Sequence, residues 1–76
     1  MKEYEVKECI GVIGRPKGLT RSRREVRLID WGNGDKIDIR SWDDNERYSK
    51  GITLSLEEAA TLTAVLRNYF MKGVRE

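Results

Sequence analysis

The side chains best suited to chemistry in this chain are arginines and tryptophans at even spacing. Arg40 and Trp42 lie in the run IDIRSW at residues 37–42, and Arg27 and Trp31 lie in the segment before it. Side chains two or four residues apart on an extended strand point to the same side of a sheet. Guanidinium groups pair with phosphates and indole rings stack on flat bases, so the pattern indicates non-covalent binding of a polyanion that carries planar rings.

A basic segment precedes and overlaps these residues. Residues 15–27 hold six basic residues and one acidic residue, a charge of +5, so the rest of the chain carries −3 to give the formal net charge of +2. A basic cluster on an otherwise mildly acidic protein is typical of a surface that binds phosphate. We expect Arg21, Arg23, Arg24 and Arg27 to contribute to such a surface. The alternative is a solvated charged loop.

The composition argues against enzymatic chemistry. Cys9 is the only cysteine and the chain has no histidine, so an intramolecular disulfide, a cysteine zinc site and a histidine-based triad are excluded. Asp43, Asp44 and Glu46 are crowded into one segment without the spacing of a cation site. We therefore expect no catalysis, no metal and no cofactor.

The length of 76 residues predicts one domain spanning residues 1–76. A monomer of this size buries only about 60% of its unfolded surface, so association with a second copy would add stability. No apolar run approaches the ~18 residues that span a bilayer, and the N-terminal residues lack the apolar core of a signal peptide. We expect a cytoplasmic protein, nucleoid-associated if it is bacterial, with no membrane partner.

Apolar and polar residues alternate in segments that predict a four-stranded antiparallel sheet followed by one helix, an α+β fold. The expected strands are residues 4–13, 25–31, 36–42 and 50–54. In the first strand, the spacing of Tyr4, Val6, Ile10 and Val12 predicts that they share a face. The helix is expected to follow a cap at Ser55 and to run to about Lys72, before Gly73.

Asn33-Gly34 predicts a tight hairpin between the second and third strands, because this pair favours positive φ angles. If Gly32 faces Asp35, Leu28 pairs with Ile39 and Ile29 with Asp38. One face is then mostly aliphatic, and the other carries Arg27, Arg40 and both tryptophans. An exposed tryptophan face on a small sheet lowers solubility unless it has a partner. Packing of the tryptophans in a core or a dimer interface is the open alternative.

The helix carries more apolar surface than one sheet requires. At 100° per residue, one stripe contains Ala59, Leu62, Leu66, Tyr69 and Phe70, and Leu56, Ala60, Ala64 and Met71 widen it to roughly 200°. Packing on a single sheet needs only about 100°. The excess predicts contact with a second subunit, and hence a homodimer.

Two segments together carry a resemblance to a known family. The run IDIRSW at residues 37–42, followed by KGITLSLEE at residues 50–58, resembles the positive cofactor four (coactivator p15-like) family of transcriptional coactivators, most closely its small bacterial YdbC-like branch. The resemblance covers about residues 26–66. It implies a homodimer that binds single-stranded DNA across two curved sheets and has no enzymatic activity.

The resemblance also implies roles for particular residues. Trp31 stands where the family places a stacking aromatic, Arg40 and Trp42 match an arginine and a tryptophan of the third strand, and Lys50 matches the lysine before a glycine. By location only, Arg21, Arg23 and Arg24 correspond to the basic first loop. The spacing from Arg40 to Trp42 is one residue shorter than in the eukaryotic coactivators. Asp43, Asp44 and Glu46 add negative charge beside this proposed channel, where they weaken binding or guide the strand.

Two other functions fit the same residues. Arginine and tryptophan are frequent at the centres of protein interfaces, so the face could dock an acidic protein partner. Single-stranded RNA is the other alternative, since it differs from DNA only through contacts to the 2′-hydroxyl.

Overall fold

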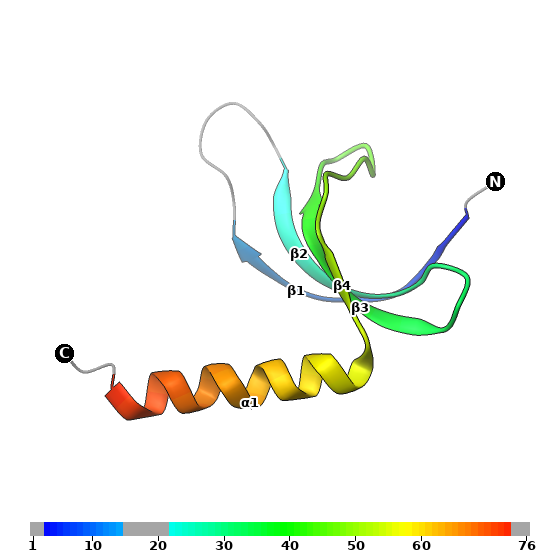
Figure 1. Ribbon diagram of the computed structural model, residues 1–76. Helices are drawn as coiled ribbons and strands as arrows, with labels where there is room; N and C mark the ends of the chain where they lie inside the picture. Colours follow the sequence, from blue (N-terminus) through cyan, green and yellow to red (C-terminus); the bar gives the residue numbers. More distant parts are fainter. Residues whose placement is uncertain (1–2, 15–21, 74–76) are drawn as a thin grey trace.

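The computed structural model describes residues 3–14 and 22–73, which form one antiparallel sheet followed by one helix (Figure 1). The elements are β1 (Glu5–Gly14), β2 (Arg23–Asp30), β3 (Asp35–Trp42), β4 (Ile52–Leu54) and α1 (Leu56–Gly73), and the sheet order is β1-β2-β3-β4. The predicted α+β order of four strands and a C-terminal helix is confirmed.

The β2–β3 hairpin differs from the prediction in its register. Asp30 pairs with Asp35 and Leu28 with Ile37, a shift of two residues from the expected pairing. The predicted two-residue Asn-Gly loop is wrong, because the Asp30 carboxylate accepts hydrogen bonds from the backbone N–H of Gly32 at 2.8 Å and of Gly34 at 3.1 Å. Gly32 and Gly34 have φ angles of 114° and 104°, which only glycine adopts freely. A longer loop therefore closes around Asp30.

A shift of two residues keeps every side chain on its predicted face. The aliphatic face of the hairpin carries Val26 and Leu28 opposite Ile39 and Ile37. The other face carries mainly charged and aromatic side chains: Glu25, Arg27, Ile29, Lys36, Asp38, Arg40 and Trp42. We call the second set, with Arg23, the arginine face. The division between an aliphatic face and an arginine face is confirmed.

The sheet bends strongly around the arginine face. Trp31 and Trp42 lie at opposite ends of the hairpin, and strands of eight residues span roughly 25 Å at about 3.3 Å per residue. Both rings nevertheless contact the Tyr48 ring, with centroids 5.7 Å and 5.0 Å away. Only a concave arginine face permits both contacts. Figure 1 shows this curvature, with α1 outside the convex, aliphatic side.

β1 is an irregular edge strand. Its pairing with β2 shifts three times, between Val6 and Glu8, between Cys9 and Gly11, and between Val12 and Gly14. Each extra residue reverses the alternation of side chains, so Val6, Cys9 and Val12 share the side of the arginine face. The prediction that Ile10 lies on the same face as Val6 and Val12 is wrong for this reason, and Ile10 is half exposed.

β4 begins at Ile52, later than the predicted start at Lys50, and the preceding Gly51 lies directly against β3. A Cβ atom at Gly51 would clash with the Ile39 carbonyl oxygen and the Arg40 Cβ. Contacts this short cannot be accommodated without backbone movement. Glycine at this position lets the β3–β4 connection pass close to Arg40.

The predicted cap of α1 is confirmed. The backbone N–H of Ser55 donates to Glu58 Oε1 at 2.9 Å, and the N–H of Glu58 donates to Ser55 Oγ at 2.9 Å. These reciprocal bonds satisfy two of the amides that a helix start leaves without partners. They fix the beginning of α1 immediately after β4.

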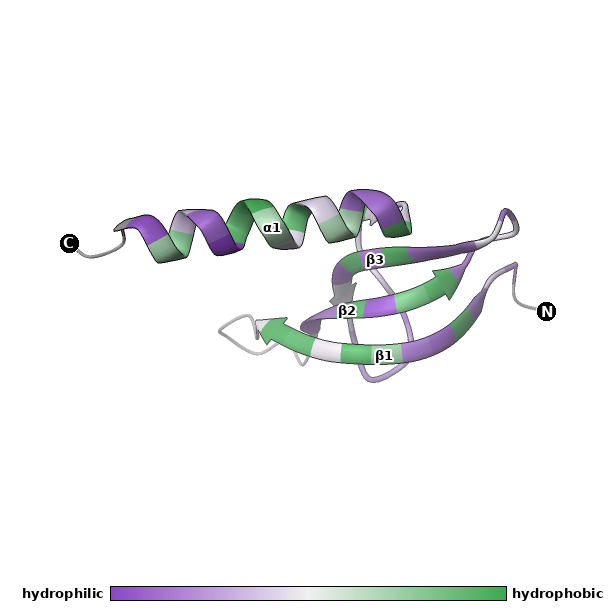
Figure 2. Ribbon diagram, turned by 90° about the horizontal axis from the view of Figure 1, so that it is seen from below, coloured by the Kyte–Doolittle hydropathy of each residue, from purple (hydrophilic) through white to green (hydrophobic). Residues whose placement is uncertain are grey.

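α1 packs against its own sheet over only a small part of its length. Among the described elements α1 contacts only β3 and β4, and Ala59 alone of residues 56–72 is half-buried, the others being exposed. Leu66, Tyr69 and Phe70 are 46%, 64% and 62% exposed. The helix diverges from the sheet, and Figure 2 shows its apolar segments (green) open along its length. Within the described ranges, no helix combines the length and apolarity that crossing a bilayer requires.

Candidate nucleic-acid interface

Four aromatic rings gather on the arginine face. The centroid of the Tyr4 ring lies 4.8 Å from that of Trp31, in a tilted arrangement, and 5.9 Å from that of Tyr48, edge to face, and Tyr48 is 5.0 Å from Trp42. We call these four side chains the aromatic cluster. Tyr48 is held there because it forms a β-bridge with Trp42, the last residue of β3, ahead of the start of β4.

Two arginines lie on these rings. The Arg27 guanidinium is 3.9 Å from the centre of the Trp42 ring, and Arg40 is 5.0 Å from that of Trp31 and 5.2 Å from that of Tyr48. Cations over aromatic faces at these distances are attracted by the ring quadrupole. Arginines and rings therefore form one packed layer.

Glu25 holds two of the arginines from beneath. Its Oε2 accepts a hydrogen bond from Arg23 Nε and its Oε1 one from Arg27 Nε, both at 2.7 Å, and Cys9 Sγ donates to Oε1 at 3.4 Å. Glu25 is only 2% exposed. Burial alone would raise the pKa of Glu25, but the hydrogen bonds from Arg27, Arg23 and Cys9 outweigh it and hold the pKa below its ordinary value. The carboxylate stays charged.

Asp38 is the buried carboxylate that holds Arg40, as Glu25 holds Arg23 and Arg27. Arg40 Nε donates to Asp38 Oδ2 at 2.7 Å, and Thr53 Oγ1 donates to Asp38 Oδ1 at 2.9 Å. Asp38 is fully buried, and it faces Thr53 because β3 pairs with β4 in that register. Two further contacts, to Thr53 Oγ1 and the Ser49 carbonyl, fix the Arg40 head group.

The β3–β4 connection, residues 43–51, brings two more carboxylates to the arginines. Asp44 Oδ1 accepts from Arg23 NH1 at 3.1 Å, and Glu46 Oε1 accepts from Arg27 NH1 at 3.3 Å. The hydrogen bonds that Arg23 donates to Glu25 and Asp44 raise its pKa. Burial alone would lower the pKa of Arg27, but its bonds to Glu25 and Glu46 outweigh that effect and raise it. Both arginines remain fully charged.

The structure places the predicted site residues in several environments. Trp42 has no exposed surface, so the expectation of an outward-facing tryptophan at this position is wrong, and Trp31 is half-buried. Trp42 is covered because Arg27 and Tyr48 lie over its ring. Neither indole N–H has an acceptor among the described residues. Each is a buried donor available to a ligand that reaches the cluster.

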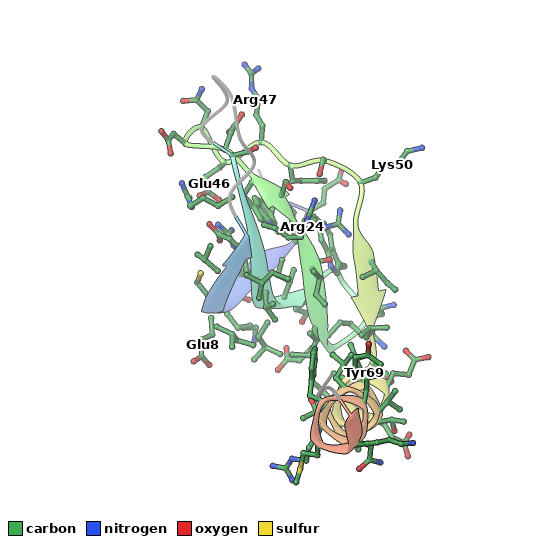
Figure 3. All side chains as sticks on the ribbon, turned by 90° about the vertical axis from the view of Figure 1, so that its left-hand side faces the viewer. Glu8, Arg24, Glu46, Arg47, Lys50 and Tyr69 are labelled. Carbon is green, nitrogen blue, oxygen red and sulfur yellow. The ribbon has the colours of Figure 1, made fainter. Side chains whose placement is uncertain are left out.

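The predicted cations do not form one surface. Arg23 and Arg24 lie in β2, not in the basic first loop, and strand alternation places Arg24 on the face opposite Arg23. Lys50 is exposed and points outward, on the other side of the sheet from Glu46 (Figure 3). Arg21 and the basic residues at 15 and 17 lie outside the described residues. Arg23, Arg27 and Arg40 are brought together with Trp31 and Trp42.

Sequence reasoning missed two members of the aromatic cluster. Tyr4 was expected only to line the first strand, and Tyr48 received no role because it lies in a polar connection. Tyr48 is 45% exposed and is the most exposed ring of the cluster, whereas Trp42 is buried. Its position two residues before Lys50-Gly51 was the available signal.

Nowhere in the described part of the chain do three or more histidine, cysteine, aspartate or glutamate side chains group as a metal site would require.

A small α+β domain whose curved antiparallel sheet gathers arginines and aromatic rings on its concave face has the form of a nucleic-acid-binding module. The family model described as Transcriptional Coactivator p15 (PC4) matches residues 19–65, more than half of the chain. The chain belongs to this family, as its residues predicted, and membership supports DNA as a partner in general. A search of curated proteins finds no match. The YdbC-like branch stays a prediction.

Proposed function

We propose that this protein binds single-stranded DNA as a homodimer, without enzymatic activity and with low sequence specificity. The observation that carries the proposal is the layer of arginines and aromatic rings on one concave sheet face. Single strands are held by cations along their phosphates and by rings on which bases stack. Neither contact reads base identity, which accounts for the low specificity.

The proposal gives the members of this layer different roles. Tyr48 and Trp31 retain exposed surface and offer ring faces to bases, whereas Trp42 supports Arg27 from below. Arg23, Arg27 and Arg40 stand beside these rings as phosphate partners. Lys50 and Arg24 lie elsewhere on the surface, where they lengthen the path of the strand or attract it at a distance.

The homodimer is supported by the exposed helix. Apolar side chains along α1 are open in the single chain, and its flat shape, 47 × 35 × 17 Å, leaves no second layer over them. A second copy of α1 and of the convex face is the partner with matching apolar surface. Light scattering should therefore give twice the chain mass. Phe70→Asp should yield monomer, whereas Lys72→Asp, a charge change on the same helix, should not.

The binding test is fluorescence anisotropy of labelled oligo-dT at two salt concentrations, with duplex DNA and single-stranded RNA of equal length as competitors. We expect salt-sensitive binding that duplex DNA does not displace. Tyr48→Ala should weaken it about fivefold or more, because stacking is worth ~1–3 kcal/mol per base, and Tyr48→Phe should retain most of it. A folded dimer that fails to bind at low salt would overturn the proposal.

Competition with RNA also distinguishes binding of single-stranded DNA from binding of single-stranded RNA. Equal displacement by RNA would extend the ligand to single strands of both kinds. The proposal also includes a role in transcription, replication or repair and a cytoplasmic location. Localisation of the tagged protein in cells would test these parts.

A further inference from the structure

The arginine face carries no net positive charge among the described residues. Arg23, Arg27 and Arg40 are all ion-paired, and their partners are four carboxylates: Glu25, Asp38, Asp44 and Glu46. With Lys36, which pairs with Ile29 on the same face, four positive charges among these residues meet four negative ones, and the charges balance. A face of this kind does not attract a polyanion from a distance, although its arginines have the chemistry to bind one.

The four carboxylates fall into two classes. Glu25 and Asp38 are buried, with side chains 3% and 0% exposed, and each binds the Nε of an arginine from inside the sheet. Asp44 and Glu46 are 48% and 52% exposed and bind NH1 groups from the solvent side. The inner carboxylates orient the guanidinium groups. The outer ones occupy positions that a ligand can reach.

The outer carboxylates are held in place by the connection itself. Asp43 Oδ1 accepts hydrogen bonds from the N–H of Asn45 at 2.8 Å and of Arg47 at 2.9 Å, which closes a tight turn. Glu46 has a φ of 61°, in the left-handed region that non-glycine residues rarely adopt. This backbone conformation directs the Glu46 carboxylate back onto Arg27. Figure 3 shows Glu46 and Arg47 at the end of the sheet remote from Tyr69 on α1.

We propose that Asp44 and Glu46 are internal substitutes for phosphate, which occupy the NH1 groups of Arg23 and Arg27 in the free protein and yield them to the backbone phosphates of a bound strand. This inference rests on the proposed single-strand binding and names how that site is regulated. The exchange is inexpensive, because ion pairs with exposed carboxylates contribute little, whereas a phosphate oxygen can accept from the same NH1 group while bases stack beside it. The device disfavours polyanions that bring charge but no stackable rings.

The first test measures oligo-dT affinity of the full chain carrying Glu46→Gln, Asp44→Asn or both. Each single substitution should raise affinity about two- to fivefold at low salt, and the double substitution by up to about 25-fold, because each removes an exposed competing pair. The log–log salt dependence should also steepen by up to ~0.7 per substitution, since a phosphate then neutralises charge at an NH1 group that no carboxylate occupies. Binding of heparin, which has charge but no bases, should rise by a larger factor than binding of oligo-dT.

Glu8→Gln is the matched control. It removes the same charge from an exposed carboxylate on β1, whose Cα partner Leu28 lies on the aliphatic face. Glu46→Asp is a second control, because it keeps the charge but shortens the side chain so that the contact with Arg27 is lost. Glu8→Gln should leave affinity unchanged, and Glu46→Asp should raise it, though less than Glu46→Gln.

The outcomes distinguish this inference from the proposed single-strand binding on which it rests. If wild-type protein binds oligo-dT and the two loop variants bind no tighter, the substitution device is disproved and single-strand binding stands. Equal gains in Glu8→Gln and Glu46→Gln would show a general charge effect and also overturn the device. If no form binds at low salt, both proposals fail. Glu46→Gly, which suits a φ of 61°, replaces Glu46→Gln if the latter does not fold.

Discussion

The two faces of the sheet reverse the usual division of a small protein. The concave face carries arginines, carboxylates and aromatic rings, and it contains every residue described as buried: Glu25, Arg27, Ile29, Asp38 and Trp42. The convex side and α1 carry the aliphatic residues, and Ile52, Leu66 and Phe70 there are about half exposed or more. In the single chain, the polar face is the packed one and the apolar face is open.

This contrast shows which surface is fully packed within the single chain. Ion pairs and ring contacts on the concave face satisfy one another within one chain, so this face needs no partner to hold its shape. The side chains of the apolar side are not covered within the single chain, because α1 diverges from the sheet. The proposed homodimer would add stability at the apolar side, which suits a domain of this size.

Of the substitutions that test this difference between the faces, truncation of the buried Trp42 ring should destabilise the protein most. Trp42→Ala should lower the free energy of unfolding by about 3–5 kcal/mol, because a large buried side chain is replaced by a cavity. Phe70→Ala, at 62% exposure, should cost under about 0.5 kcal/mol in dilute protein, where dimer does not contribute. Urea denaturation of both variants at one low concentration tests this. Similar losses would place the core equally on both faces.

Breaking the inner carboxylate contact should come next. Glu25→Gln should cost about 3 kcal/mol, because Arg27 is 6% exposed and would lose its main charged partner. Glu46→Gln removes an outer partner of the same arginine and should cost less than about 1 kcal/mol. The two variants, compared by urea denaturation, sharpen the distinction between structural and displaceable carboxylates. A Glu46 effect as large as that of Glu25 would contradict it.

Gly51→Ala should have an intermediate effect of about 1–3 kcal/mol, since the added methyl group meets the β3 backbone. Gly11→Ala is the control, because a Cβ there meets nothing within 4 Å. It should be neutral or slightly stabilising, through loss of chain entropy in the unfolded state. Thermal unfolding monitored by circular dichroism distinguishes the pair, and equal melting temperatures would refute the argument.

The smallest effect should be a pH dependence at the hairpin. Backbone hydrogen bonds from Gly32 and Gly34 hold the pKa of Asp30 below its ordinary value. A carboxylate whose pKa is lower when folded stabilises the protein above its unfolded pKa of about 3.9, and this contribution is lost as pH falls through the folded pKa. The stability difference between wild type and Asp30→Asn should therefore be constant from about pH 7 to 5 and shrink below pH 4. Urea denaturation across that range checks it, and an unchanging difference would be contrary evidence.

Local chemistry allowed much of the fold to be predicted. Alternation gave the four strands and both faces, and Ser55 with Glu58 gave the start of α1. The hairpin register was wrong because Asp30 competes for the turn amides, a side-chain contact that the Asn33-Gly34 pattern does not reveal. The irregular pairing of β1 was missed because three bulges leave no regular period in sequence.

The site was harder to predict than the fold. Even spacing correctly grouped Arg27, Arg40 and Trp42 on one face, but it carried no information on curvature, which buries Trp42 under Tyr48. The division of acids into inner and outer partners also depends on tertiary contacts between β2 and the β3–β4 connection. Whether these residues bind nucleic acid stays a prediction.

Both tryptophans of the chain lie in the aromatic cluster, and neither lies on α1. Indole emission responds to nearby charge and to stacking, so the protein contains its own optical reporter for one surface. Ligand entry at the concave face should change that emission directly, whereas assembly through the helix should leave it nearly constant. A single unlabelled sample can thus distinguish occupancy of one face from association through the other.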